Sequence, residues 1–221
     1  MIFYICLALA IIPLMILLPT RVKGRKNIPG KGKMILVCNH QSNLDAVIIA
    51  SKILKRRFHF MAKSELFKHK LSGAFYKALG MYPVNRKQND IRAIKTTLGY
   101  LNKGKALCIF PEGTRLKTEE VKDIKNGVAM FALKTKSPIV PSFFVNKPKF
   151  FGITTYIIGK PFNLSEMEEF KDKPITKDIL NRASEVISEK MNEIKEGYEE
   201  SKAKKSKKKD KKNKKNDKKD A

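Results

Sequence analysis

The sequence predicts an α/β fold, with a mixed, largely parallel sheet flanked by helices, an N-terminal membrane-associated helix and a disordered basic C-terminal tail. Two observations predict the central fold. Short apolar segments of strand length alternate with segments of helical periodicity, which is typical of a sheet with helical crossovers. Polar residues suited to chemistry directly follow several of the apolar segments, and open α/β sheets bind ligands at their strand ends.

The expected elements follow the apolar pattern in chain order. Residues 34–38 are continuously apolar and predict a buried strand. All expected strands are residues 34–38, 58–62, 81–84, 106–110, 139–145 and 154–159. The helices expected between them are residues 45–54, 65–79, 90–102 and 127–135. Residues 176–200 carry apolar side chains at helical spacing and predict a further helix packed on the core.

His40 and Asp45 lie in a run directly after the expected strand 34–38. Five residues along a continuous helix rotate by about 140°, so the two side chains can meet only if a loop turns between them. A loop leading into a helix that begins at Asp45 supplies this turn. With the carboxylate on one ring nitrogen, the other nitrogen is free to take a proton from a hydroxyl. The pair predicts a general base acting on a substrate alcohol, although such a pair alone also fits a purely structural role.

Two arginines also follow expected strands. Arg86 ends the segment 80–86, and Arg115 ends the run FPEGTR at residues 110–115. The planar guanidinium offers a fork of donors that matches phosphate oxygens. Gly113, which has no side chain, allows the backbone to approach a ligand closely. These features predict a phosphate pocket at the strand ends.

With these motifs in this order, the chain resembles the 1-acylglycerol-3-phosphate acyltransferases of the glycerolipid acyltransferase superfamily. Four ordered blocks carry the resemblance, at residues 39–45, 80–86, 110–115 and 137–142. Residues 61–67 and 125–129 are also similar, so that the resemblance covers roughly residues 24–162.

The resemblance implies a role for each matching position. His40 is the general base and Asp45 orients it. The substrate phosphate is bound by Glu112, Gly113, Thr114 and Arg115, with Arg86 close to the same acceptor. Lys63 is a further candidate for the phosphate, and it fits a solvated surface lysine equally well.

The implied reaction moves a fatty acyl group from a thioester donor to the sn-2 hydroxyl of lysophosphatidic acid. The product is phosphatidic acid, an intermediate of phospholipid biosynthesis. The donor is acyl-CoA or acyl carrier protein, and the expected mechanism uses no metal and no organic cofactor. Glycerol 3-phosphate or another lysophospholipid remains an alternative acceptor, because the same blocks occur across the superfamily.

The charge of the chain is strongly positive, with 47 Lys and Arg against 21 Asp and Glu and a net charge of +26. Residues 201–221 carry 12 Lys and 3 Asp, so a charge of +17 remains on residues 1–200. A basic body attracts an anionic lipid surface, an acidic carrier protein, a phosphorylated substrate or nucleic acid. A membrane-tethered nucleic-acid-binding protein is therefore the alternative from another class. Nucleic acid is disfavoured because the aromatic residues lie mostly in apolar runs and are not interleaved with lysines.

The N-terminal residues predict a membrane-associated segment. Residues 2–18 are uncharged and apolar apart from Pro13, and a basic cluster follows at residues 21–26. Seventeen helical residues measure about 25 Å, against about 30 Å for a hydrocarbon core, so the segment either spans a thinned bilayer or is re-entrant. The basic cluster places the rest of the chain at the cytoplasmic face of the cell membrane. A cleaved signal peptide is disfavoured because no Lys or Arg precedes the apolar residues.

These observations divide the chain into three parts. Residues 1–20 form the membrane-associated segment, residues 21–200 the acyltransferase domain, and residues 201–221 a lysine-rich tail. The tail has no apolar residue except two alanines and is expected to be disordered. It serves either solubility or attraction to an anionic membrane. The three cysteines, Cys6, Cys38 and Cys108, lie in apolar runs and are expected to be reduced packing residues.

Overall fold

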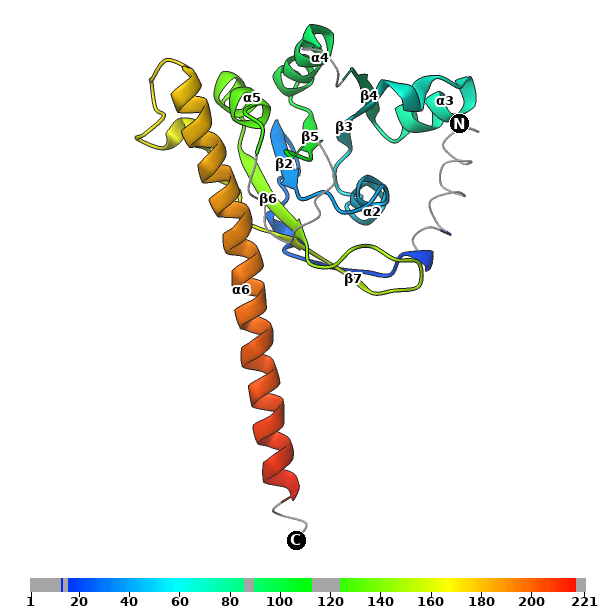
Figure 1. Cartoon of the computed structure of the whole chain (residues 1–221), viewed down its shortest axis with the longest axis vertical. Helices are drawn as coiled ribbons and strands as arrows, with labels where there is room; N and C mark the ends of the chain where they lie inside the picture. Colours follow the sequence, from blue (N-terminus) through cyan, green and yellow to red (C-terminus); the bar gives the residue numbers. More distant parts are fainter. Residues whose placement is uncertain (1–12, 14–15, 86–89, 113–123, 218–221) are drawn as a thin grey trace.

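A seven-stranded sheet organises the described part of the chain, with helices on both of its faces (Figure 1). The structure, a computed structural model, describes residue 13 and residues 16–85, 90–112 and 124–217. The strand order is β1-β7-β6-β2-β5-β3-β4. Strands β2 to β6 are parallel to one another, β7 is antiparallel to β6, and β1 is parallel to β7. The predicted α/β fold with a mixed, largely parallel sheet is confirmed.

The strands match the apolar segments closely. Their bounds are β1 Thr20–Lys23, β2 Met34–Cys38, β3 Phe58–Lys63, β4 Met81–Val84, β5 Ala106–Ile109, β6 Ile139–Phe144 and β7 Thr154–Ile158. β2 has neighbours on both sides and helices over both faces, so all five of its residues are buried. β1 was not predicted. It is a four-residue edge strand of alternating exposure whose charged side chains make it resemble a basic loop in sequence.

The helices cover the two faces unequally. They are α2 Asp45–Lys52, α3 Lys70–Ala78, α4 Ile91–Asn102, α5 Gly127–Thr135 and α6 Lys177–Asp217, with 3-10 turns η1 Arg25–Asn27, η2 Ser64–Phe67 and η3 Leu164–Glu166. Side chains of α2 pack with the strands in one buried cluster, against which α3 also packs. α4, α5 and α6 contribute to a second cluster on the opposite face. Cys38 and Cys108 are buried and unbridged in the first cluster, as packing residues, whereas Cys6 lies outside the described residues.

The predicted helix over residues 65–79 is two separate pieces. η2 ends at Phe67, His69 has an extended backbone, and α3 then begins at Lys70. The Ser72 hydroxyl lies within hydrogen-bonding distance of the carbonyl oxygens of Leu66, at 3.3 Å, and His69, at 3.2 Å. The His69 carbonyl oxygen also accepts the first helical hydrogen bond of α3, from the Gly73 amide. A side-chain hydroxyl in the first turn of α3 therefore connects the two helical pieces.

The two chain ends differ in how far the structure describes them. The predicted membrane segment falls mostly on residues 1–12, 14 and 15, which lie outside the described residues. Among the residues that are described, no helix is both long enough and apolar enough to cross a membrane. The structure therefore does not show the expected N-terminal membrane helix.

The prediction that residues 201–221 are disordered is wrong for most of that segment, because α6 continues to Asp217. The buried residues Ala183, Ile187 and Met191 fix the first part of α6 on the core, so the costly first turn is already formed. Lysine has good helix propensity, and no Gly or Pro follows Gly197 to end the helix. A lack of apolar residues keeps the tail off the core but does not end the helix.

Gly80 makes the turn from α3 into β4. Its φ is +83°, and its carbonyl oxygen accepts a hydrogen bond of 3.1 Å from the Phe60 amide of β3. A Cβ atom at this position would overlap the backbone carbonyl oxygen of Phe58. Only glycine combines this backbone angle with such a close approach.

We expect Gly80→Ala to lower the free energy of unfolding by more than about 1 kcal/mol, because alanine fits neither the backbone angle nor the space. The control is Gly99→Ala inside α4, three residues before its end, where a new Cβ meets no atom within 4 Å. This change should raise the free energy of unfolding by about 0.5–1 kcal/mol. Urea denaturation measures both values, and equal effects at the two glycines would contradict the assignment for Gly80.

Candidate active site

The loop between β2 and α2 brings His40 against Asp45. Asp45 is the first residue of α2 and is fully buried, whereas the His40 side chain keeps 16% of its surface exposed. The Nδ1 atom of His40 lies 2.8 Å from Oδ2 of Asp45. The predicted contact between the two side chains is therefore present.

The same carboxylate oxygen also fixes the loop. Oδ2 of Asp45 accepts hydrogen bonds from the backbone amides of Gln41, at 2.7 Å, and Ser42, at 2.8 Å. A carboxylate accepts and does not donate, so the proton of the histidine ring belongs on Nδ1 and the lone pair on Nε2. No described residue hydrogen-bonds Nε2. The loop thus presents an oriented imidazole whose second ring nitrogen has no hydrogen-bond partner within the described part of the chain.

Phe110 lies beside this histidine. The rings of His40 and Phe110 are stacked, with centroids 4.3 Å apart and an angle of 22° between their planes. Phe110 directly follows β5, the neighbour of β2 in the sheet. The stacking restrains the imidazole from the side that Asp45 does not cover.

Asn39 ties the histidine loop to the end of β6. Its side-chain Oδ1 accepts from the Phe144 amide at 2.7 Å, and its Nδ2 donates to the Phe144 carbonyl oxygen at 3.1 Å. The side-chain amide of Gln41 donates to the same carbonyl oxygen at 3.2 Å. No separate role was predicted for these two side chains, although a polar residue directly after a fully apolar strand is a usable sequence signal for Asn39.

Glu112 reaches the same loop from the end of β5. Its Oε2 accepts a hydrogen bond of 3.2 Å from the backbone amide of His40. Burial, with a smaller contribution from the negative charge of Asp45, raises the pKa of Glu112 to about 7, although the hydrogen bond from His40 opposes the shift. The motif around Glu112 and the histidine loop, 72 residues apart in sequence, are therefore in direct contact.

Of the remaining predicted site residues, the structure describes only Lys63. Lys63 is exposed at the end of β3, two strands from β2 and at the same edge of the sheet as His40. Arg86, Gly113, Thr114 and Arg115 lie outside the described residues. Within the described part of the chain, no three His, Cys, Asp or Glu side chains are grouped so that they could hold a metal ion.

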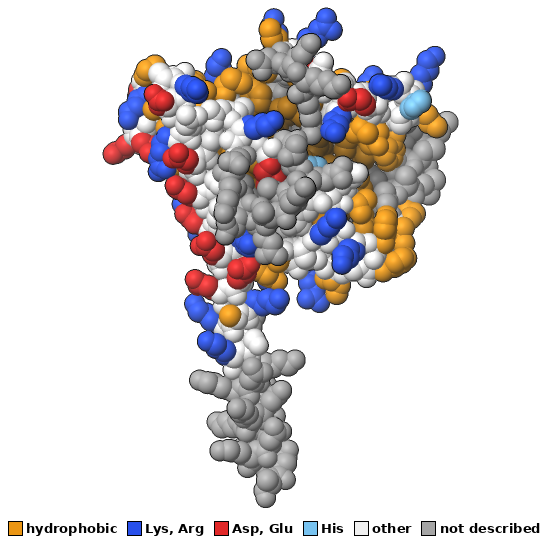
Figure 2. Space-filling model, in the orientation of Figure 1, with side chains coloured by type: hydrophobic (Ala, Val, Ile, Leu, Met, Phe, Trp, Pro, Cys, Tyr) orange, Lys and Arg blue, Asp and Glu red, His pale blue; other side chains and the backbone are white. Residues whose placement is uncertain are grey.

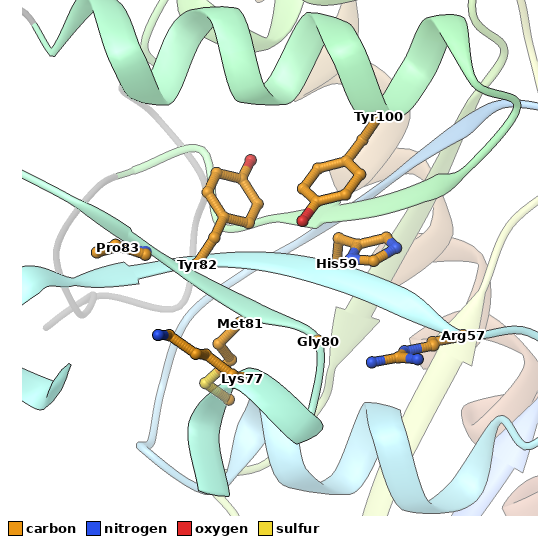
Figure 3. Close-up of a pocket in the computed structure, with 8 residues that line it drawn as sticks. All are labelled: Arg57, His59, Lys77, Gly80, Met81, Tyr82, Pro83 and Tyr100. Carbon is orange, nitrogen blue, oxygen red and sulfur yellow. The ribbon is translucent and has the colours of Figure 1, made fainter. Parts of the chain in front are cut away.

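A pocket of 240 Å³ lies along the edge strand β4 (Figure 3). The rings of His59 from β3 and Tyr100 from α4 stack in it with centroids 4.0 Å apart, and Tyr82 lies beside them. Burial and the positive charges of Arg57 and Lys105 lower the pKa of His59. None of the predicted site residues lines this pocket.

Comparison with known proteins gives consistent matches. The family model described as Acyltransferase matches residues 19–145. The 1-acyl-sn-glycerol-3-phosphate acyltransferase of Bacillus subtilis is 30% identical over 79% of this chain and 87% of its own length. The protein of the same name from Streptococcus pneumoniae is 28% identical over 76% of this chain and 64% of its own length.

A solved structure is also similar. The crystal structure of the 1-acyl-sn-glycerophosphate acyltransferase PlsC from Thermotoga maritima matches with a TM-score of 0.64 and 26% sequence identity. The match covers 86% of this chain and 75% of the Thermotoga chain. The similarity therefore extends beyond the four sequence blocks to the fold.

The raised pKa of Glu112 predicts a specific pH dependence of stability. A carboxyl group whose pKa is higher in the folded state than its ordinary 4.5 favours the protonated form on folding. This group's contribution to the free energy of unfolding is present at low pH. It is lost as the pH rises from about 4.5 to about 7, by up to about 3 kcal/mol.

Glu112→Gln keeps an acceptor for the His40 amide but does not titrate. Urea unfolding at about pH 5 and about pH 8 should therefore show a steeper loss of stability for the wild-type protein than for Glu112→Gln. Equal losses would show that Glu112 titrates near its ordinary pKa.

Proposed function

The chain belongs to the acyltransferase family, among the 1-acyl-sn-glycerol-3-phosphate acyltransferases, and from this premise we propose how its own residues carry out the transfer. A fatty acyl group moves from a thioester donor to the sn-2 hydroxyl of lysophosphatidic acid. The observation that carries the proposal is the His40–Asp45 contact of 2.8 Å on a partly exposed ring, whose Nε2 atom has no partner among the residues that the structure describes.

His40 acts as the general base. Its Nε2 takes the proton of the sn-2 hydroxyl while that oxygen attacks the thioester carbonyl carbon. The tetrahedral intermediate then collapses, the carbon–sulfur bond breaks, and His40 returns the proton to the departing thiolate. The products are phosphatidic acid and a free thiol, and no acyl-enzyme forms. General-base help of this kind contributes about 10²- to 10⁴-fold to the rate.

Asp45 supports this cycle in two ways. It holds the imidazole in the tautomer whose Nε2 is unprotonated, and its negative charge stabilises the imidazolium that forms after proton transfer. Because its Oδ2 also binds two loop amides, the charge is fixed in place before substrate arrives. Such preorganisation needs no rearrangement during the reaction.

The acceptor's phosphate binds to the FPEGTR motif. Arg115 supplies a planar fork of donors, and Gly113 lets the backbone approach because it has no side chain. Thr114 offers a hydroxyl donor, and Arg86 and Lys63 add positive charge. Glu112 serves this site indirectly, since its carboxylate hydrogen-bonds the His40 backbone and so couples the phosphate loop to the base. Binding the phosphate then fixes the sn-2 hydroxyl relative to Nε2.

The remaining partners follow from the reaction and the charge. Acyl-CoA or acyl carrier protein serves as co-substrate, and the mechanism uses no metal or organic cofactor. The charge of +17 on residues 1–200 favours an anionic membrane surface. We place the protein at the cytoplasmic face of that membrane, where its lipid substrate and thioester donors meet.

We expect His40→Ala to lower the turnover of purified protein by about 10²- to 10⁴-fold, because the variant has no base for the hydroxyl proton. The assay measures phosphatidic acid formed from lysophosphatidic acid with each thioester donor. His69→Ala, a change at an exposed histidine directly before α3, is the control and should retain wild-type turnover. Near-normal turnover in His40→Ala would remove His40 from the mechanism.

Arg115→Ala tests the phosphate assignment separately. Loss of one charged hydrogen-bonding partner should raise the KM for lysophosphatidic acid by about tenfold or more, while the KM for the thioester donor changes little. Steady-state kinetics with each substrate varied in turn distinguishes the two constants. If both constants and the turnover remain at wild-type values, Arg115 does not bind the acceptor.

A further inference from the structure

We propose that the β6–β7 loop, residues 145–153, contacts an anionic phospholipid bilayer and inserts Phe150, Phe151 and Ile153 into its interface. The proposal rests on the proposed lipid acceptor, which resides in such a bilayer. It names a contact surface distinct from the N-terminal apolar segment. It can also be tested without measuring acyl transfer.

The loop exposes three large apolar side chains close together. Phe150 is 56% exposed, Phe151 77% and Ile153 54%. Figure 2 shows hydrophobic side chains gathered at the lower right, beside lysines and arginines, where Figure 1 draws this loop next to β1. Soluble proteins rarely expose large contiguous apolar patches, and such patches mark interaction sites.

The β6–β7 loop holds Phe151 in a backbone conformation that is unfavourable for a bulky residue. Phe151 has a φ of +59°, a left-handed conformation that bulky residues rarely adopt. Its amide donates to the Leu17 carbonyl oxygen at 2.8 Å, and the next amide, of Gly152, donates to Lys149 at 3.2 Å. Strained backbone that surrounding contacts maintain is concentrated at functional sites. Here the strain keeps an aromatic side chain pointed away from the core.

The loop is joined to the end of the apolar N-terminal sequence. Besides the Phe151–Leu17 hydrogen bond, the Thr154 amide donates to the Pro19 carbonyl oxygen at 2.9 Å. Residues 2–18 are uncharged, so the loop lies beside the point where an apolar segment enters the folded domain. The loop is therefore held against residues 17–19, the described end of this apolar sequence.

The charges around the loop favour an anionic surface. Lys147 and Lys149 are exposed within the loop, and Arg21 of β1 pairs with Thr155 at its base. The sequence has no Asp or Glu before residue 45 and none between Asp123 and Glu166. The segments that form this corner therefore contain no carboxylate to repel anionic headgroups. Aromatic rings flanked by basic residues suit the bilayer interface.

The loop also leaves the sheet next to the catalytic loop. It begins directly after Phe144, whose carbonyl oxygen accepts hydrogen bonds from the side chains of Asn39 and Gln41. The carboxyl end of β6 and that of β2, which leads to His40, lie side by side because the two strands are parallel neighbours. A loop seated in the interface therefore places the edge of the sheet that carries His40 close to the lipid acceptor.

The chain contains no tryptophan, so a single introduced indole reports on one position. We expect the fluorescence of full-length Phe151→Trp to shift to shorter wavelength on phosphatidylglycerol-containing vesicles, and to be quenched by brominated acyl chains. Phosphatidylcholine vesicles should give a much smaller change. The matched control is Leu54→Trp, at a position 75% exposed just before β3, which should show neither effect.

Three outcomes would overturn the proposal. The first is unchanged Phe151→Trp emission while the protein sediments with the vesicles. The second is an emission shift that occurs without lipid and depends on protein concentration, which would indicate contact with a second copy of the chain. The third is an equal response to anionic and neutral vesicles. Adding His40→Ala to the Phe151→Trp protein should leave quenching intact, so failure of the catalytic assignment is distinguishable. Phe150→Ser with Phe151→Ser should lower transfer to vesicle-bound lysophosphatidic acid by about tenfold or more and spare transfer to a dispersed short-chain acceptor.

Discussion

The buried carboxylate of Asp45 is the interaction on which the site depends. One oxygen accepts from His40 Nδ1 and from two loop amides, so the same atom closes the turn after β2 and sets the ring orientation. A buried carboxylate without such donors would be costly, because burial removes its hydration. The loop geometry and the orientation of the His40 ring therefore depend on the same carboxylate. A sequence that lost the carboxylate would lose the turn and the orientation of the imidazole together.

Parallel strand order explains why distant motifs meet. β2 and β5 are neighbours, so their carboxyl ends place His40 and Glu112 in contact although 72 residues separate them. β6 lies on the other side of β2 and supplies the backbone of Phe144 to the side chains of Asn39 and Gln41. The histidine loop is thus held from both sides by strand ends. This arrangement follows from the sheet order, which the chain order of the motifs does not reveal.

The sequence predicted the buried strands and the central pair because each had a strong local signal. The apolar run of β2 and the helix α5 were predicted with the observed bounds, and the spacing of His40 and Asp45 correctly required a turn before α2. β1 was not predicted because the sequence of this edge strand contains two charged residues in four and no run of apolar residues. The length of α6 was not predicted, because composition indicates only whether a segment can be buried. A helix whose first part packs on the core can continue into solvent without further burial. The stacking on Phe110 had no sequence signal, since it depends on which strands are adjacent.

The two carboxyl groups near His40 have different roles because their surroundings differ. Asp45 has three donors on one oxygen, and its negative charge contributes to raising the pKa of Glu112 to about 7. Glu112 receives one backbone hydrogen bond and is otherwise desolvated, so near neutral pH it exchanges between neutral and ionised forms. In the proposed mechanism, the positive charge that forms on His40 during proton transfer would favour the ionised form of Glu112, because the Glu112 carboxylate accepts from the His40 backbone amide.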